Sequence, residues 1–455
     1  MTTLVERLAG YASALRYEDL PAEVVRQAKR LIVDTVGCAL GGYGSEPAVI
    51  AGELAATVTS TRPATVMVSG RRTSPDLAAF VNGVMIRFLD YNDGYTSTGE
   101  SGHPSDSIAA ALTAAELAGR SGKDLIVATV LAYELFCRIC DEADLKPLGW
   151  DHVTVGGIAS LAAAAKLLGL ESRRLTEAFN LGIAPNIALY QTRIGTVSMW
   201  KGCAYANASR NALFAAQLAA RGMTGPSPIY EGRGGFFTAV SRKPFELAPF
   251  GDKDAPFLIM QCFVKRFPLG QYSQSVVQAA LEAREHIGGD VANIAEVHVR
   301  TLATAVHMMA GDPDKWRPEN GETADHSMPY TAGVALMHGT IEGRHFDDPY
   351  LHDPALLDLV GRIRCSISPE ADAREPEAML CDLELKMKNG RQETVRVEYH
   401  RGHWLNPMSD GELEEKFRPL AAPVLPAPRI GALLQRLWAL ETVGDVAELF
   451  ALTRK

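Results

Sequence analysis

The strongest constraint on the fold is a succession of helical patterns that runs from the start of the chain to about residue 222. Segments 21–42, 74–90, 104–119 and 157–170 carry apolar residues at helical intervals, and several begin at proline or serine and end at glycine. Their many alanines and glycines allow helices to approach closely. Because strands do not alternate with helices here, a multi-helix domain is expected and a doubly wound sheet is not.

The pattern changes after "EGRGGFF". "IAEVHVRTLATAV" and "RIRCSIS" have the composition of strands, and "AMLCDLELKMKNGRQETVRVEYHRG" predicts a hairpin that turns at Asn389-Gly390. Helical patterns return in the tail. The sequence therefore predicts a mostly α protein with a smaller α+β domain: an all-helical domain at 1–265, completed by 401–455, and an α+β domain at 266–400.

Charge and composition exclude several classes of protein. The net charge is −9 and no long run of lysine or arginine is present, so neither nucleic acid nor an anionic membrane is expected as a partner. No signal-peptide pattern and no uncharged apolar run of about 18 residues occurs, so we expect a cytoplasmic, soluble protein. The seven cysteines are scattered, which predicts free buried thiols. Cys137 and Cys140 have metal-type spacing but no second pair, which disfavours a zinc or iron–sulfur site.

Polar residues concentrate in the stretch "LDYNDGYTSTGESGHPSDS", residues 89–107. Asp90 and Asp93 are three residues apart, and at the end of the preceding helix they are expected to face the same side. The stretch does not fit a calcium-binding EF-hand, because its fifth and twelfth places, counted from Asp90, are Gly94 and Ser101. Paired acids without that spacing leave acid–base chemistry or solvated loop acids as interpretations.

His103 precedes a proline, and this places it at the N-terminus of the helix that follows. There the helix dipole opposes protonation of the imidazole, and the free backbone N–H groups favour a carboxylate ligand. The alternative is that His103 only caps the helix. Four further polar residues stand at comparable breaks, where each alone fits a cap but together they would suit a polycarboxylate: His152, Lys201, His326 and Tyr330.

Several motifs, in order, resemble the MmgE/PrpD family over nearly the whole chain. They are "SPDLAAFVNGVMIRFLDYNDGY", "GHPSD", "GWDHV", "WKGCAYANASRNALFAAQLAARGMTGPSPIYEGRGGF", "VKRFPLGQYSQSVVQAAL" and "DHSMPYTAGVAL". Members include 2-methylcitrate dehydratase, cis-aconitate decarboxylase and iminodisuccinate epimerase. The resemblance implies a two-domain architecture with the α+β domain as a lid, an active site between the domains, a homodimer, and no metal or organic cofactor.

The resemblance also implies the site residues, carried over by motif. The expected catalytic residues are Asp93, His103, His152, Lys201 and Tyr330. The expected substrate-binding residues are Asp90, Asn92, Ser105, Tyr272, Gln274 and His326. One position departs from the pattern, because many relatives have a histidine where this chain has Gln274.

The expected function is that of a cofactor-independent hydro-lyase that removes a proton next to a carboxylate. His103 and Lys201 would bind and polarise the carboxylates of the substrate, and His152 or Asp93 would move protons. Dehydration of 2-methylcitrate or a similar hydroxy polycarboxylate is the first hypothesis. Epimerisation, isomerisation or decarboxylation of a small di- or tricarboxylate is the second. A catalytically silent scaffold and a metal-dependent lyase are the remaining alternatives.

Overall fold

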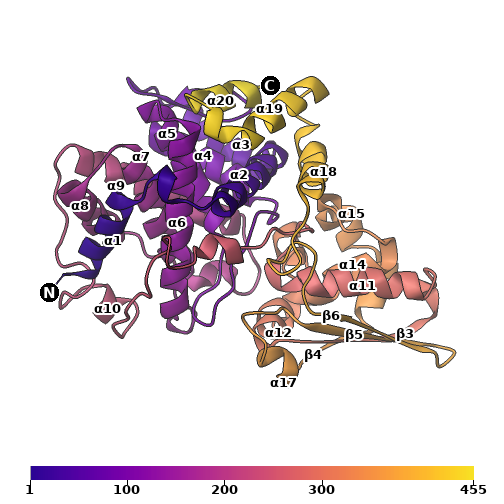
Figure 1. The fold of residues 1–455 in the computed structure, drawn as a ribbon. Helices are drawn as coiled ribbons and strands as arrows, with labels where there is room; N and C mark the ends of the chain where they lie inside the picture. The colour runs from indigo at the N-terminus through magenta and orange to yellow at the C-terminus, as the bar shows by residue number, and fades with distance from the viewer. Residues whose placement is uncertain (1) are drawn as a thin grey trace. The chain divides into compact units, whose positions relative to one another are not determined.

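The computed structural model describes residues 2–455, which form two compact units. The first unit contains the chain up to residue 192 together with 202–262 and 409–455, and the second contains 193–201 and 263–408. Figure 1 shows the chain in colour order, and its yellow C-terminal helices belong to the first unit. The first unit is therefore assembled from three separate stretches of chain.

The first unit is built mainly of helices. They are α1 (Leu4–Ala14), α2 (Ala22–Gly42), α3 (Glu46–Ala56), α4 (Pro75–Arg87), α5 (Ile108–Ala118), α6 (Gly122–Glu142), α7 (Val153–Leu167), α8 (Ser172–Ile183), α9 (Trp200–Ala220), α10 (Phe236–Ala239), α18 (Asp410–Ala421), α19 (Ala427–Trp438) and α20 (Ala447–Thr453). Two short antiparallel strands, β1 (Ala64–Thr65) and β2 (Arg72–Thr73), interrupt the series. The expectation of helices alone before residue 222 is thus only partly right.

Local sequence sets the ends of these helices. Ser121 precedes α6, its hydroxyl accepts the N–H of Asp124, and the Asp124 carboxylate accepts the N–H of Ser121. By contrast, α4 ends at Arg87, and Asp90 lies beyond it with a positive φ of 46°. The prediction that Asp90 and Asp93 share a helix face is therefore wrong, because the chain has left the helix before it reaches them.

Small residues let the helices pack closely, as their composition predicts. A Cβ atom on Gly42 of α2 would lie 2.1 Å from the carbonyl oxygen of Met85 in α4. A Cβ atom on Gly156 of α7 would lie 2.3 Å from the ring of Tyr205 in α9. Side chains larger than hydrogen cannot fit at these two positions without moving backbone or a buried ring.

The second unit combines a mixed sheet with short helices. Its helices are α11 (Gln274–His286), α12 (Ala303–Ala310), α13 (Gly321–Ala324), α14 (Met328–His338), α15 (Asp348–Leu351), α16 (Pro354–Val360) and α17 (Pro369–Asp372). Its strands are β3 (Ile294–Thr301), β4 (Ile363–Ile367), β5 (Cys381–Met387) and β6 (Gln392–Val397). The strand order is β4-β3-β5-β6, in which β3 and β4 are parallel and the other neighbours antiparallel.

The core of the second unit lies between the sheet and the helices that cover it. Figure 1 shows α11 alongside the sheet, and Val297 and Val299 of β3 are fully buried in the same cluster as Val276 and Val277 of α11. The predicted hairpin is present as β5 and β6, and Gly390 has a φ of +87° at the turn. The chain is therefore mostly helical with a small mixed sheet, as predicted.

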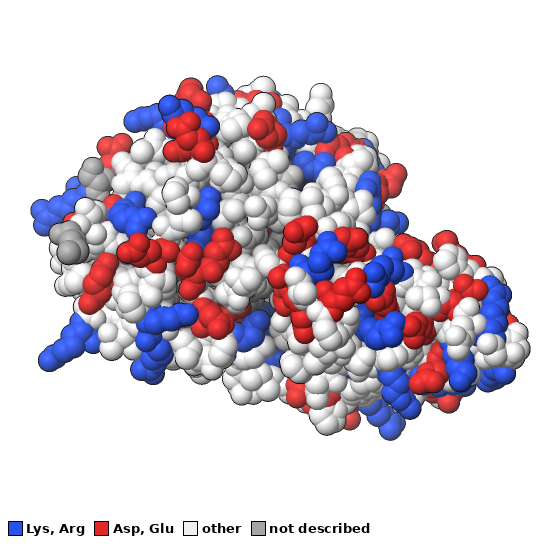
Figure 2. Space-filling view, turned by 60° about the horizontal axis from the view of Figure 1, so that its bottom comes forward, with Lys and Arg blue, Asp and Glu red and all other residues white. Residues whose placement is uncertain are grey.

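The surface and the thiols also agree with the sequence. On the face in Figure 2, acidic and basic residues are interspersed with uncharged ones. All seven cysteines are free, and every one except the half-buried Cys365 is buried. Across residues 2–455, no helix is both long enough and apolar enough to cross a membrane.

Candidate functional site

Two histidines lie side by side in the first unit. The ring centroids of His103 and His152 are 5.5 Å apart, and the rings meet edge to face at 79°. His103 directly precedes a short 3₁₀ helix, η2 (Pro104–Ser107), which leads into α5, and His152 directly precedes α7. Both side chains are buried. Each histidine therefore lies at the start of a helix, as predicted, and the two rings are close to one another.

Each imidazole is held through its Nδ1 atom. Nδ1 of His103 is 2.7 Å from the backbone carbonyl oxygen of Asp93, and Nδ1 of His152 is 2.9 Å from the Oδ1 atom of Asp151. A carbonyl and a carboxylate oxygen can only accept, so Nδ1 carries the hydrogen in both rings. In the neutral ring, Nε2 then holds the lone pair, which is the arrangement that a general base needs.

Asp93 is fully buried beside His103. Its Oδ1 atom accepts the N–H of Ser105 at 3.1 Å. Burial raises the pKa of Asp93 to about 6, and the Ser105 and Tyr133 side chains oppose that rise. Asp93 therefore changes charge near the range in which enzymes use carboxyl groups for proton transfer.

Asp90 and Asn92 belong to a buried ionic network next to this group. The Arg87 guanidinium lies 2.6 Å from the Asp90 carboxylate and 3.5 Å from that of Asp106. Asn92 donates to Asp106 at 2.7 Å and to the Ser105 hydroxyl at 2.8 Å. These contacts satisfy charges that would otherwise be costly to bury, and they fix the loop that carries His103.

A second buried ion pair fixes the start of the same loop. Lys416 of α18 lies 2.6 Å from the Asp34 carboxylate of α2 and donates to the carbonyl oxygen of Tyr91 at 2.7 Å. Its ammonium also lies 3.9 Å from the centroid of the Tyr91 ring. Much of the polarity in the first part of residues 89–107 is therefore structural, because it holds the loop that leads to His103.

Lys201 forms a cluster with acids of the second unit. The fully buried ammonium lies 2.7 Å from Asp325 and 2.8 Å from Glu322, and the Nδ1 atom of His326 is 2.5 Å from the other oxygen of Asp325. Burial raises the pKa of Glu322, although the Lys201 charge opposes this effect. The carboxylates of Asp325 and Glu322 hold the Lys201 ammonium in place. A buried cation of this kind is a group that binds carboxylates.

Three other predicted residues have structural partners. The Tyr330 hydroxyl donates to the carbonyl oxygen of His345 at 2.7 Å, and burial raises its pKa. The Gln274 amide accepts the N–H groups of Arg266 and Phe267 and donates to the Phe267 carbonyl oxygen. Tyr272 lies in the hydrophobic core. Gln274 therefore stabilises the preceding loop, which gives this residue a structural role.

The structure thus groups the predicted residues by unit. Asp93, Ser105, His103 and His152 lie together in the first unit, and Lys201 and His326 lie together in the second. Sequence reasoning missed the partners Arg87, Asp106, Asp151, Glu322 and Asp325. Two of these acids belong to motifs quoted above, Asp106 to "GHPSD" and Asp151 to "GWDHV". Their closeness in sequence to His103 and His152 was the feature from which they could have been predicted.

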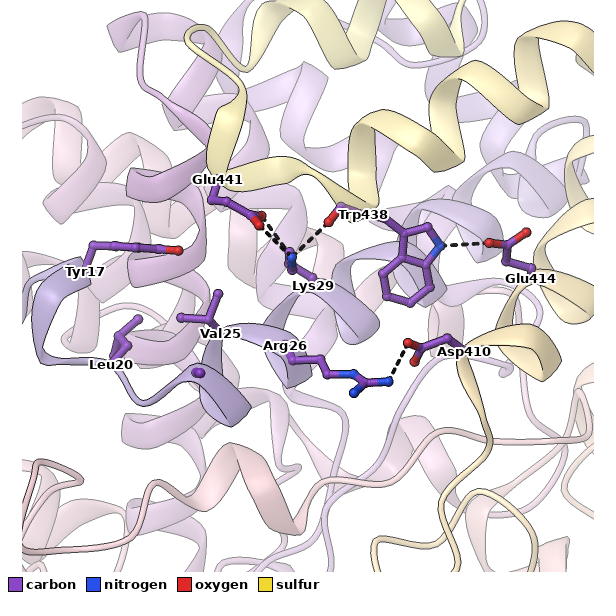
Figure 3. Close-up of a pocket in the computed structure, with 10 residues that line it drawn as sticks. Tyr17, Leu20, Val25, Arg26, Lys29, Asp410, Glu414, Trp438 and Glu441 are labelled. Carbon is purple, nitrogen blue, oxygen red and sulfur yellow. Dashed lines mark hydrogen bonds and ion pairs between the residues drawn. The ribbon is translucent and has the colours of Figure 1, made fainter.

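A groove of about 730 Å³ on the first unit has a different character (Figure 3). Lys29 donates to the Glu441 carboxylate and to the carbonyl oxygen of Trp438, and Arg26 pairs with Asp410. The Trp438 indole N–H donates to Glu414 at 3.1 Å. Among the described residues, no histidine lines this groove, whereas His103 and His152 supply two side chains that can exchange protons, so the histidine pair is the better candidate.

Comparison with known proteins extends over nearly the whole chain. A family model described as the MmgE/PrpD N-terminal domain matches residues 6–248, and one described as the MmgE/PrpD C-terminal domain matches residues 267–440. The chain is 27% identical to human cis-aconitate decarboxylase over 472 residues, which cover 100% of this chain and 95% of that protein. It is 28% identical to 2-methylcitrate dehydratase of Cupriavidus necator, covering 92% and 90% of the two chains, and 29% identical to the Escherichia coli K12 dehydratase, covering 85% and 84%.

Proposed function

Because the chain belongs to the MmgE/PrpD family, we propose that it is a lyase that acts on a small polycarboxylate. The reaction we assign to it is dehydration of 2-methylcitrate or a similar hydroxy polycarboxylic acid. Two of the relatives named above are dehydratases of 2-methylcitrate, and they match most of this chain. Identities below 30% support the class of reaction more strongly than the identity of the acid.

The histidine pair is the observation that carries the proposal. Elimination of water next to a carboxylate needs one group to remove a proton from carbon and another to protonate the departing hydroxyl. His103 and His152 are two proton carriers with ring centroids 5.5 Å apart, each oriented through Nδ1. The buried Asp93 is the third group that can exchange a proton, because its pKa is about 6.

Lys201 is assigned to binding. A lysine that is surrounded by carboxylates keeps its charge, so it is a better ligand for an anionic substrate than a base. Tyr330 has no chemical role in this proposal, because its hydroxyl is used in a hydrogen bond to His345.

The test is an NMR assay of chelator-treated protein in deuterated water. 2-Methylcitrate, citrate, cis-aconitate and a panel of dicarboxylates are offered in turn. An alkene formed from a hydroxy acid supports the dehydratase. Deuterium uptake without loss of water would favour an epimerase or isomerase instead, and no change in any acid would favour the silent scaffold. Activity that is lost with the chelator and restored by a divalent ion would favour the metal-dependent lyase.

Variants connect the assay to the site. His103→Ala and His152→Ala should each lower kcat by about 10²- to 10⁴-fold, the usual contribution of a general acid or base. His286→Ala is the matched control, because that side chain is 53% exposed. Turnover by His103→Ala at nearly the wild-type rate would overturn the assignment.

Decarboxylation is the second candidate function. The full-length match to a cis-aconitate decarboxylase favours it, and the same assay detects it as loss of carbon dioxide from cis-aconitate. The homodimer and the cytoplasmic location expected from the sequence stay predictions.

A further inference from the structure

The two histidines differ in what holds their Nδ1 atoms. The partner of His103 is a neutral backbone carbonyl, whereas the partner of His152 is the carboxylate of Asp151, which is 1% exposed. A buried carboxylate stabilises an imidazolium much more than a carbonyl does, because it supplies a full negative charge at low dielectric. The surroundings of the pair are therefore asymmetric.

Asp151 is itself held firmly by the start of α7. Its Oδ1 atom also accepts the N–H of Val153 at 3.0 Å, and its backbone N–H donates to the carbonyl oxygen of Ala188 at 2.9 Å. The carboxylate thus binds the first free N–H of the helix and the imidazole with the same atom. Backbone groups of Val153 and Ala188 therefore hold Asp151 in place.

Gly102 also restricts the position of the His152 ring. A Cβ atom on Gly102 would lie 2.5 Å from Cδ2 and 2.7 Å from Cγ of the His152 ring. The ring therefore packs directly on the backbone of the loop that carries His103. Any side chain at residue 102 would displace the imidazole from Asp151 or change its distance to His103.

We propose that Asp151 and Gly102 are positioning residues that make His152 the proton-bearing member of the pair and leave His103 as the neutral base. The inference rests on the proposed function for its catalytic meaning. In the reaction, Nε2 of His103 takes the proton from the carbon next to the carboxylate, and the electrons of that C–H bond form the C=C bond. The C–O bond breaks, and the hydroxyl leaves as water with the Nε2 proton of His152. One proton then passes from His103 to His152, which restores both rings.

Other titratable groups near the pair affect both histidines and are kept constant in the test. The ring centroid of Tyr205 is 6.4 Å from that of His152. Further charged groups in this region include the carboxylates of Asp93, Asp106 and Glu100 and the ammonium of Lys146, which lies 3.8 Å from Glu100. The Asp151 carboxylate lies 2.9 Å from Nδ1 of His152, whereas Nδ1 of His103 lies against the backbone carbonyl of Asp93, so a change at Asp151 should act more strongly on His152.

The experiment is a pH titration of the full chain labelled with ¹⁵N-histidine and followed by NMR without substrate. His103→Gln and His152→Gln identify the two signals. In the wild type, His152 should lose its proton at a pH at least about one unit above His103. Asp151→Asn keeps an oxygen for the N–H of Val153 and should lower the midpoint of His152 by about one unit or more, while the midpoint of His103 stays unchanged. Asp151→Glu should restore part of the difference.

Two further variants separate position from charge. Gly102→Ala should disturb the His152 signal although Asp151 is intact. Asp141→Asn is the matched control, because this acid accepts the Tyr95 hydroxyl at 2.8 Å and should leave the midpoints of both histidines unchanged. In the activity assay, Asp151→Asn should lower kcat at least tenfold with little change in KM and should shift the pH profile of kcat.

The outcomes distinguish this inference from the proposed function. A midpoint of His103 above that of His152, or a variant at Asp151 that moves both signals equally, overturns the inference even if the protein dehydrates a polycarboxylate. The predicted order of midpoints supports it even if every acid in the panel is left unchanged, in which case only the assigned reaction fails.

Discussion

Lys416 and Asp34 form an ion pair at 2.6 Å in which both side chains are almost fully buried, at 3% and 1% exposure. The pair joins α18, from the C-terminal part of the chain, to α2, from the N-terminal part. The same ammonium binds the carbonyl oxygen of Tyr91, at the start of the loop that leads to His103. Stability of the first unit and order in the histidine loop therefore depend on one lysine.

Lys416→Met should reduce the free energy of unfolding by about 3–5 kcal/mol, because it leaves the Asp34 charge buried without its partner. Urea unfolding followed by tryptophan fluorescence measures the change. Arg26→Met is the matched control on the same pair of helices, since Arg26 also binds an acid of α18 but is 67% exposed. The control should cost about 1 kcal/mol or less. Equal losses in the two variants would contradict the prediction.

Gly42→Ala should destabilise the first unit, because the new Cβ atom would lie 2.1 Å from the Met85 carbonyl oxygen and force α2 and α4 apart. We expect a loss of about 2–3 kcal/mol, visible as a lower Tm. Gly52→Ala is the control. That glycine also lies inside a helix but has no atom within 4 Å of the added Cβ, so it should gain about 0.5–1 kcal/mol. A Tm that falls equally in both variants would refute the packing argument.

Asp93→Asn should change how stability depends on pH. Because burial raises the pKa of Asp93 from 3.8 to about 6, the folded state binds the proton more tightly than the unfolded state does. The wild type therefore loses stability from this group as pH rises from about 4 to about 6, by about 3 kcal/mol in total. The asparagine variant should lack this loss, and its stability relative to the wild type should improve over that interval.

Unfolding at a series of pH values measures the difference between Asp93→Asn and the wild type. Asp254→Asn, whose side chain is 79% exposed, is the control and should run parallel to the wild type. If the difference between Asp93→Asn and the wild type were constant with pH, Asp93 would not titrate in this interval.

Lys201→Met should raise KM for the polycarboxylate by about tenfold or more, because it removes a buried cation that we assign to substrate binding. Loss of Lys201 should also raise the pKa of Glu322 further, because in the wild type the Lys201 charge opposes the effect of burial on that carboxyl group. Initial rates over a range of substrate concentrations measure the change. Lys253→Met, at an 87% exposed position, is the control. A fall in kcat with unchanged KM would mean that Lys201 acts in the chemical step instead.

Much of the fold was predictable, because helix starts, glycine ends and the Asn389-Gly390 turn are encoded in neighbouring residues. His103 and His152 could be placed at helix N-termini for the same reason. The position of Asp90 could not, since α4 ends at Arg87 and the chain is then directed by the buried contact between those two residues. The structural use of Gln274 and Tyr330 was likewise hidden, because the atoms that bind them come from other segments.

The three-part construction of the first unit has a consequence for its synthesis on the ribosome. Asp34 emerges early, but Lys416 is made only after the whole second unit has been translated. Until then the nascent N-terminal helices carry an acid without its cation and a face of α2 that α18 has not yet covered. The second unit, apart from residues 193–201, is one uninterrupted stretch that can form its own core first, so we expect the N-terminal part of this chain to complete its folding last.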